Sequence, residues 1–433
     1  MKRTALETWI QGKIGAEPGA GAALNRSDLE AWQLRKLNET LSLARQRSVF
    51  YRKQLAGKRE SLDSLQDIQH LPFTTADDLR RIPLQFVCVS QDDIQRVVTL
   101  QSSGTTGEPK RIYFTAADQE LTIDFFDVGM SVLTEENDRV LILLPGETPG
   151  SVGDLLRLGL MRQKRVPLPY GPVRDPLHTL ASMQEQQVDC LVGSPTQILG
   201  LARRTRPGRH KLRSVLLSTD HVPDAIVKIL EETWSCRVFN HYGATETGLG
   251  GGVECEAHQG LHMREADLYV EIIDPSTGQP VPEGDYGEVV VSTLTRVGMP
   301  LIRYRIGDRS RFLLGGCACG THLKTMEVVR GRYSGFIRLG EELLRMQDLD
   351  EALFCLPDLL NFTVTVSGQV GQENVLVTAH MLNPVDSPAR VQQALAALPA
   401  LQNCAVSVVC QHSPHEPGSL LKRTIIDKRG QHA

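Results

Sequence analysis

The sequence of 433 residues is 41% hydrophobic and 23% charged, which is ordinary for a globular protein, and its length predicts at least two domains. A formal net charge of −4 gives no electrostatic reason to expect a nucleic-acid-binding or membrane-surface protein. The sequence lacks an apolar run of about 18 residues, and no apolar segment follows the early cations of MKRTALETWIQGKIG. We therefore expect a cytoplasmic protein without a spanning helix or a secretory signal.

The first hundred residues predict mainly helical structure. The small residues of AEPGAGAALN, 16–25, are typical of a linker. Ser27 and Glu30 form a capping-box pattern, and apolar residues at helical spacing follow as far as Ala44. We therefore expect a long helix that begins near Ser27, and a new helix start within HLPFTTADDLRR.

From about residue 95 to residue 240, short apolar runs alternate with helix-like stretches at 117–133, 175–187 and 222–234. The runs share many β-branched residues and read RVVTLQ, RVLILLP, VDCLVGSP, SVLLSTD and CRVFNHYG. This alternation predicts a mainly parallel sheet with helices on its faces. In such sheets, ligands bind beyond the carboxyl ends of the strands.

Residues 266–314 alternate in hydrophobicity and carry Pro/Gly turn signals, which predicts β structure. Beyond them, a helix-like segment at 347–354 mixes with strand-like runs. We therefore expect an α/β protein with two domains. The large N-terminal domain, 1–330, would combine mainly parallel sheets flanked by helices with a β-rich subdomain, and a small, mobile α+β domain would follow at 331–433.

One loop, within LQSSGTTGEPKRIYFT (100–115), combines glycines, hydroxyl side chains and a cation. Glycines let the backbone bend, hydroxyls donate hydrogen bonds, and a lysine adds charge, so the loop is suited to phosphate oxygens. The candidate phosphate-binding residues are Ser102, Ser103, Gly104, Thr105, Thr106, Gly107 and Lys110. The spacing is not that of a P-loop, and an ordinary turn is the alternative.

A second glycine-rich bend, NHYGATETGLGGG (240–252), places Tyr242, Gly243, Thr245 and Glu246 after a strand-like run. A carboxylate beside phosphate is unfavourable unless a cation lies between them. Glu246 therefore predicts Mg²⁺ bound to nucleotide phosphates.

A third stretch, MPLIRYRIGDRSRF (299–312), places Asp308 among several arginines. A carboxylate in this setting can accept two hydrogen bonds from a sugar diol while the cations face phosphate. A surface ion-pair network is the alternative.

Together, these stretches resemble the adenylate-forming superfamily of acyl-CoA synthetases, and most closely its phenylacetate–CoA ligase branch. The matching segments are SSGTTGEPK, HYGATETG, ECEAHQGLH, EIIDPSTGQPVPEGDYGEVVVSTLTRVGMPLIRYRIGD and GRYSGFI. The resemblance runs from about residue 30 to the C-terminus and is strongest between residues 95 and 332.

The resemblance implies a reaction in two steps. A carboxylate attacks the α-phosphorus of ATP, pyrophosphate leaves, and a thiol, usually that of coenzyme A, displaces AMP from the acyl-adenylate. The loop from Ser102 to Gly107 would hold the β- and γ-phosphates, with Lys110 at its edge. Glu246 would bind Mg²⁺, and Thr245 would contact the α-phosphate.

The same resemblance implies that Asp308 holds the ribose hydroxyls and that Arg332, at the family's hinge, reaches ribose or phosphate. Further nucleotide candidates lie at the adenine-facing segment and in the second bend, and they are Ser218, Thr219, Asp220, Tyr242 and Gly243.

Two departures from the family concern the C-terminal region. The family carries a lysine near the chain end that stabilises the adenylation transition state, and Lys422 in GSLLKRTIIDKRG is the candidate, with a solvated basic tail as the alternative. At the hinge, Ser334 stands where a charged residue is usual. Two alternatives therefore stay open: an adenylation enzyme that loads a carrier protein or another nucleophile, and a non-catalytic nucleotide-binding protein.

The nine cysteines, an odd number, do not suggest a disulfide framework. Cys317 and Cys319, with Cys255 and His262 upstream, offer the ligands of a tetrahedral Cys₃His zinc site, and such residues recur in the branch that the sequence resembles. His258 is an alternative fourth ligand. Four unlinked residues in turns are the alternative to any metal site.

The acid would lie near the helix around TIDFFDVGM, with Phe125, Phe126 and His241 as candidate walls. Aromatic walls suit an aryl or arylacetic acid, although ordinary core packing also explains the phenylalanines. We expect a small carboxylic acid, ATP and coenzyme A as partners, a homodimer as a candidate assembly, and neither nucleic acid nor a membrane.

Overall fold

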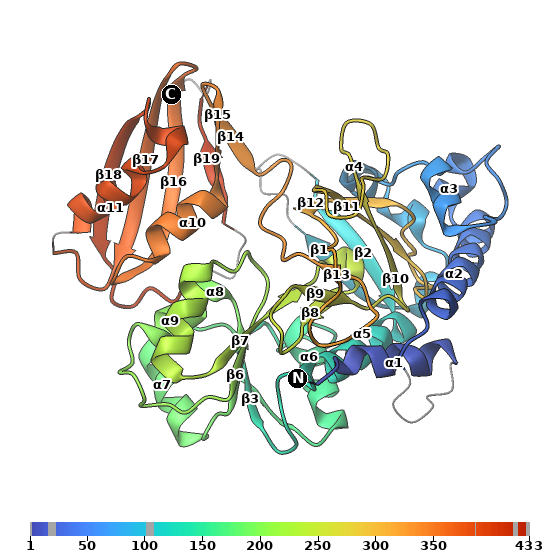
Figure 1. Cartoon of the computed structure of the whole chain (residues 1–433), viewed down its shortest axis with the longest axis horizontal. Coiled ribbons are helices and arrows are strands. Elements are labelled where there is room, and N and C mark those ends of the chain that lie inside the picture. The colour runs from blue at the N-terminus through green and yellow to red at the C-terminus, as the bar shows by residue number, and fades with distance from the viewer. Residues whose placement is uncertain (1, 16–22, 101–107, 386, 419–422, 430–433) are drawn as a thin grey trace. The chain divides into compact units, whose positions relative to one another are not determined.

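A computed structural model describes the chain except residues 1, 16–22, 101–107, 386, 419–422 and 430–433 (Figure 1). The chain forms two compact units. The first contains Met1–Glu136, Glu147–Lys164 and Phe239–Val329, and the second contains Asn137–Gly146, Arg165–Val238 and Arg330–Ala433. The predicted division into domains at residue 330 stays a prediction, although the chain enters the second unit for the last time at that residue.

The first unit begins with helices, as the sequence predicts. Its α-helices are α1 (Ala5–Ile14), α2 (Arg26–Arg47), α3 (Val49–Gln54), α4 (Ala76–Arg81), α5 (Ala116–Met130) and α6 (Val152–Arg162). Its 3₁₀ turns are η1 (Leu65–His70), η2 (Pro83–Phe86), η3 (Gln91–Asp93) and η4 (Thr245–Thr247). The expected cap of α2 is wrong by two residues: Asn25 is the N-cap, and its side chain accepts a hydrogen bond from the backbone N–H of Ser27.

Three groups of strands complete the first unit. An antiparallel pair contains β1 (Ile94–Leu100) and β2 (Lys110–Thr115), and a three-stranded antiparallel sheet contains β10 (Leu268–Ile273), β11 (Gly287–Thr293) and β12 (Tyr304–Ser310). The third group, in the order β13-β9-β8-β7, contains β7 (Arg237–Tyr242), β8 (Gly252–Glu254), β9 (Leu261–Met263) and β13 (Thr325–Met326). The expectation that RVVTLQ joins a parallel sheet is therefore wrong, because this run pairs antiparallel with β2.

The parallel sheet lies in the second unit. Its strands, in the order β4-β3-β5-β6, are β4 (Val166–Pro169), β3 (Arg139–Ile142), β5 (Cys190–Gly193) and β6 (Ser214–Leu217). The alternating helices are α7 (Pro176–Glu185), α8 (Pro195–Ala202) and α9 (Asp224–Trp234). Every residue of β5 and β6 is buried, as expected for parallel strands covered on both faces.

The C-terminal hundred residues add a mixed sheet to the second unit. The elements are β14 (Phe336–Leu339), β15 (Glu342–Arg345), α10 (Met346–Phe354), β16 (Leu359–Gln369), β17 (Gln372–Met381), α11 (Ser387–Ala396), η5 (Pro399–Leu401), β18 (Ala405–His412) and β19 (Ile425–Asp427). The sheet order is β18-β17-β16-β19. The predicted fold class is confirmed: parallel strands flanked by helices, a β-rich part, and an α+β C-terminal part.

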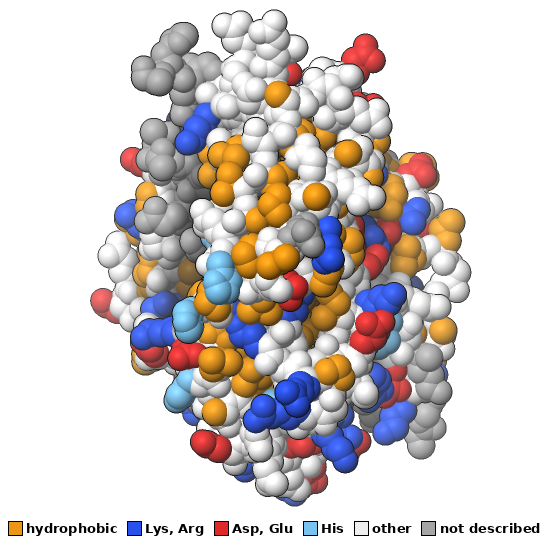
Figure 2. All heavy atoms as spheres, turned by 90° about the vertical axis from the view of Figure 1, so that its left-hand side faces the viewer, with side chains coloured by type: hydrophobic (Ala, Val, Ile, Leu, Met, Phe, Trp, Pro, Cys, Tyr) orange, Lys and Arg blue, Asp and Glu red, His pale blue; other side chains and the backbone are white. Residues whose placement is uncertain are grey.

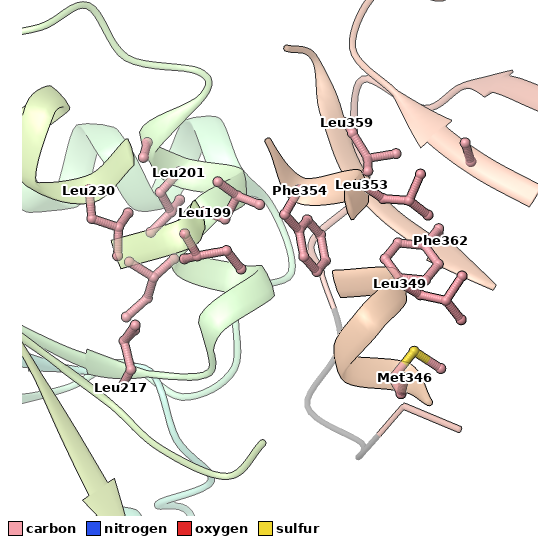
Figure 3. Packing of buried hydrophobic residues seen from close by; sticks show 14 of the residues in the cluster. Leu199, Leu201, Leu217, Leu230, Met346, Leu349, Leu353, Phe354, Leu359 and Phe362 are labelled. Carbon is pink, nitrogen blue, oxygen red and sulfur yellow. The ribbon is translucent and has the colours of Figure 1, made fainter. Parts of the chain in front are cut away.

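One hydrophobic core joins the two parts of the second unit. Leu199 of α8 and Leu230 of α9 belong to the same buried cluster as Leu353 and Phe354 of α10 and Phe362 of β16 (Figure 3). Segments on either side of residue 330 are therefore packed together by burial of apolar side chains.

The surface carries both charged and hydrophobic side chains, as the overall composition indicates. On the face seen in Figure 2, side chains of both charges are interspersed among hydrophobic ones. Within the described ranges, none of the helices has the length and hydropathy needed to cross a bilayer.

Candidate active site

Two of the predicted motifs meet through a buried ion pair in the first unit. Lys110 opens β2, and Glu246 lies in the single turn η4, just after β7. The ammonium of Lys110 contacts the carboxylate of Glu246, whose side chain is 8% exposed. The residue that follows the hydroxyl-rich loop and the candidate metal-binding carboxylate are therefore neighbours.

The third motif joins this pair through Tyr304, the first residue of β12. Its hydroxyl donates to Glu246 Oε1 at 2.9 Å, and Lys110 Nζ donates to the same hydroxyl at 3.3 Å. We call Lys110, Glu246 and Tyr304 the ionic cluster. Sequence reasoning missed Tyr304, although a signal was available, because strand periodicity puts residues 304 and 308 on one face.

Asp308 lies further along that face of β12. Residues 304, 306 and 308 are buried, whereas residues 305 and 307 are only partly buried. Asp308 Oδ2 accepts a hydrogen bond of 3.0 Å from the hydroxyl of Tyr242, at the end of β7. Two predicted nucleotide-binding residues are thereby in contact, and the strand of Asp308, β12, also carries Tyr304 of the ionic cluster.

Charge pairing keeps Glu246 ionised. Burial by itself would raise the pKa of Glu246, but the charge of Lys110 and the hydrogen bonds from Lys110 and Tyr304 outweigh it and lower that pKa. The buried carboxylate is therefore an anion at neutral pH, with a cation already beside it. A divalent cation could replace that ammonium without changing the sign of the local charge.

The predicted walls of the acid pocket also lie together. Phe125 and Phe126 of α5 and His241 of β7 have ring centroids 6.0 to 6.3 Å apart, and both phenylalanines are buried. Burial, with the nearby charge of Arg264, lowers the pKa of His241 to about 4. This wall is therefore aromatic and uncharged at neutral pH.

Helix α5 is fastened to the turn that carries Glu246. Arg264, which is 3% exposed, donates to the carbonyl of Thr247 at 2.6 Å and to that of Leu121 at 3.2 Å. Thr122 Oγ1 donates to the carbonyl of Gly248 at 2.7 Å. The turn and the acid-wall helix are thus linked by three hydrogen bonds, a role of Arg264 for which the sequence offered no signal.

Glycine is required at two places in this turn. Gly248 has φ +73°, and a Cβ there would lie 3.0 Å from Arg264 Nη2. A Cβ on Gly250 would lie 2.4 Å from Cδ1 of Phe125. The turn can therefore approach α5 this closely only because these positions lack side chains.

The remaining predicted site residues fall elsewhere. Residues 102–107 and Lys422 lie outside the described residues. Ser218, Thr219, Asp220 and Arg332 belong to the second unit, where Thr219 has φ +80°. The carboxylate of Asp220 accepts hydrogen bonds from the backbone of His221 and from Arg423. The catalytic and binding roles assigned from sequence stay predictions.

The four predicted zinc ligands converge in the first unit. Cys255 follows β8, His262 lies in β9, and Cys317 and Cys319 lie in the loop after β12, and the four ligand atoms lie within 4.8 Å of one another. We call these four residues the cysteine cluster. The alternative ligand, His258, is outside it and packs on Phe239 with ring centroids 4.7 Å apart.

Two of the distances between ligand atoms in the cysteine cluster are close to those of a tetrahedral centre. Sγ of Cys255 lies 3.5 Å from Sγ of Cys317, and Sγ of Cys319 lies 3.6 Å from Nε2 of His262. Ordinary zinc–ligand bonds at tetrahedral angles place two sulfurs about 3.8 Å apart and a sulfur and a nitrogen about 3.6 Å apart. Burial lowers the pKa of His262 to about 4, so its imidazole is neutral, as a metal ligand must be.

Comparisons with known proteins show which family the chain is similar to. The family model described as AMP-binding enzyme matches residues 30–295. A phenylacetate-coenzyme A ligase from Thermus thermophilus is 28% identical over 383 residues, covering 84% of this chain and 83% of that protein. A phenylacetate-coenzyme A ligase from Pseudomonas putida is 27% identical, covering 76% of this chain and 77% of that protein.

Solved structures support the fold. A 2-hydroxyisobutyryl-CoA ligase in the postadenylation state, in complex with R3-HIB-AMP, superposes with a TM-score of 0.80. It is 19% identical in sequence, and the match covers 96% of this chain and 94% of that chain.

Proposed function

Because the chain belongs to the AMP-binding enzyme family and is similar to its phenylacetate–CoA ligases, we propose that it is an ATP-dependent acid–thiol ligase. It activates an aryl or arylacetic acid as the acyl-adenylate and transfers the acyl group to coenzyme A. The observation that carries this proposal is the meeting of three separate motifs in one unit, through Lys110, Glu246 and Tyr304.

The first half-reaction joins an anion to a polyanion, so the site must neutralise charge at phosphorus. The acid's carboxylate oxygen attacks the α-phosphorus, and the bond to the pyrophosphate oxygen breaks. Lys110 moves from Glu246 to the phosphates, and Thr245 donates to the α-phosphate. Glu246 would hold Mg²⁺, which supplies a Lewis acid for the phosphate oxygens, and the cation already beside this carboxylate shows that the position accommodates positive charge.

Asp308 binds the ribose in this proposal. Tyr242 fixes the carboxylate by its 3.0 Å hydrogen bond to Oδ2, so the group is oriented before the nucleotide arrives. In the second half-reaction, the thiol of coenzyme A attacks the acyl carbon and AMP leaves. Lys422, Arg332, Ser218 and Thr219 keep the roles that the sequence predicts.

We propose that the cysteine cluster holds one structural zinc ion. The supporting observations are the four soft or neutral ligands, their mutual distances and their complete burial. A closed set of four protein ligands leaves no position for substrate, so this zinc would stabilise the fold. Metal analysis of protein purified without a His-tag should find about one zinc per chain, and less than about 0.2 would contradict the site.

We also infer a cytoplasmic location. All nine cysteines are free in the structure, which fits a reducing compartment. The candidate homodimer stays a prediction.

Acid-dependent exchange of pyrophosphate into ATP tests the proposed function. We expect exchange with at least one member of a panel of aromatic and short aliphatic acids, and AMP release that coenzyme A stimulates. If only an acyl-carrier protein stimulated the release of AMP, that protein would replace coenzyme A as the proposed acceptor. Absence of exchange with every acid would leave the non-catalytic alternative in place.

A further inference from the structure

A buried ion network in the second unit lies outside the site described above. Arg423 donates through Nη1 to Asp350 Oδ1 at 2.6 Å and through Nη2 to Asp350 Oδ2 at 2.9 Å. Its Nε donates to Asp220 Oδ2 at 3.3 Å. A single guanidinium therefore holds two carboxylates, one from α10 and one from the loop after β6.

The network is isolated from solvent. The side chains of Arg423, Asp350 and Asp220 are 7%, 0% and 12% exposed. The guanidinium also lies over the rings of Phe354 and Phe362, at 4.9 Å and 5.4 Å from their centroids. Two parallel hydrogen bonds to one carboxylate, together with contacts with two aromatic rings, fix the orientation of the guanidinium more firmly than a single ion pair would.

The two carboxylates have different positions along the chain. Asp350 lies in the same C-terminal part of the chain as Arg423, and its two oxygens are both engaged by the arginine. Asp220 lies 203 residues before Arg423 in the chain. It directly follows Thr219, which has φ +80°. A β-branched residue in the left-handed region is strained and needs support from its surroundings.

A second contact from α10 supports the same loop. Glu351 accepts hydrogen bonds of 2.9 Å and 3.3 Å from the backbone N–H groups of Asp224 and Ala225, at the start of α9. Glu351 can serve as a structural comparison for Asp220, because it links α10 to the start of α9, and neither of these hydrogen bonds involves Arg423.

We propose that Arg423 is a positioning residue, which fastens the C-terminal segment to the Ser218–Asp220 loop and so sets the geometry of the first half-reaction. The inference rests on the proposed function. Asp220 then acts through Arg423, and not on the nucleotide itself as the sequence suggested.

The first experiment measures pyrophosphate exchange in Asp220→Asn, Arg423→Met and the double variant. We expect each single variant to lower kcat about 10-fold, with KM for ATP within about 3-fold of wild type. The double variant should be no slower than Arg423→Met, because each single change already removes the contact between Asp220 and Arg423. A rise in KM for ATP with kcat unchanged in Asp220→Asn would assign Asp220 to the nucleotide and overturn the proposal, as would additive losses.

Glu351→Gln is the matched control. It should lower the melting temperature while leaving kcat for exchange within about 2-fold of wild type. A loss of exchange equal to that of Asp220→Asn would show that any loosening of the loop has the same effect, and Arg423 would then have only a structural role.

A second measurement keeps this inference separate from the proposed function. Limited trypsin digestion, read by mass spectrometry, should cut after Arg423 at least about 3-fold faster in Asp220→Asn than in wild type, because the buried arginine is released. Unchanged cleavage would contradict the fastening even if the enzyme were inactive. Absence of exchange in wild type, with faster cleavage in the variant, would overturn the proposed function and the role in the reaction while leaving the contact itself supported.

Discussion

The ionic cluster and the cysteine cluster are built from the same two stretches of the chain, but they are completed in different ways. The segment after β7 supplies Glu246 and then Cys255, while β12 supplies Tyr304 and the loop beyond it supplies Cys317. In the ionic cluster, Lys110 already balances the carboxylate. In the cysteine cluster, burial raises the pKa of the Cys255 and Cys317 thiols, so they stay protonated until a cation replaces the protons.

The comparison shows how each kind of buried group is stabilised before its ligand binds. A charged group that is paired within the protein can be buried without its reactant, because its desolvation is offset by a neighbour of opposite sign. Neutral thiols can be buried as well, but they contribute a metal's binding energy to the fold only when the metal is present. We therefore expect changes in the ionic cluster to affect the reaction, and changes in the cysteine cluster to affect stability.

The largest effect should come from Glu246→Gln. Without the carboxylate, the site can no longer hold a divalent cation at the phosphates, and exchange of pyrophosphate should fall on the order of 100- to 1,000-fold. Glu254→Gln, in the neighbouring strand β8, is the control, because Glu254 is a buried carboxylate whose Oε2 accepts hydrogen bonds from Asn240 and lies 3.6 Å from Nδ1 of His258. Equal losses of exchange in Glu246→Gln and Glu254→Gln would contradict a specific role of Glu246 in the reaction.

Lys422→Ala should have the next largest effect. We expect a loss of at least about 100-fold in pyrophosphate-forming activity, as for other groups that stabilise a transition state electrostatically. Lys428→Ala provides the comparison, since Lys428 is an exposed cation in the same segment. If Lys422→Ala kept wild-type adenylation, this residue would leave the list of catalytic candidates.

Lys110→Met should cost about 10-fold at neutral pH and should change the pH profile. In wild type, the pKa of Glu246 is held below its usual value, so its charge is constant at neutral pH and is lost only as pH falls through that low pKa. Removal of Lys110 takes away the largest effect that opposes burial and leaves the hydrogen bond from Tyr304, so the pKa of Glu246 rises, and exchange should begin to decline at a higher pH than in wild type. Lys110→Arg should keep the wild-type acidic limb, and an unshifted limb in Lys110→Met would contradict the pairing.

Cys319→Ser should have the smallest effect on exchange, within about 3-fold, but should lower the melting temperature by roughly 5 °C or more because a ligand of the proposed zinc is lost. Cys355→Ser, which alters an exposed thiol, should leave both unchanged. Should Cys319→Ser melt like wild type, the cluster would hold no stabilising metal.

Much of the fold follows from local sequence patterns. The helices near 117–133 and 222–234 are present as α5 and α9, because both stretches have apolar periodicity, and the Thr115 side chain also caps α5. The antiparallel pairing of β1 was not predictable, because a strand's own residues do not specify the direction of its partner. The cap at Asn25 was missed because Ser27 and Glu30 offered a competing local pattern.

The sites were predictable to the extent that their residues stand in recognisable stretches. Glu246, Asp308 and the cysteine cluster were proposed from residue type and resemblance, and the structure brings the members of each cluster together. The contacts of Arg264 and Arg423 could not be read from sequence. Each buries a cation against a partner far away along the chain, and only the three-dimensional path of the chain creates such neighbours.

The fastening of α5 to the turn has a consequence for attempts to broaden the range of acids. Trimming Phe125 to admit a bulkier acid would also remove the surface against which Gly250 rests, since a Cβ on that glycine would lie 2.4 Å from the ring. Enlargement on that side would loosen Glu246, the proposed metal-binding carboxylate, together with the proposed acid wall. Redesign should therefore begin at Phe126, which leaves the Gly250 contact with Phe125 in place.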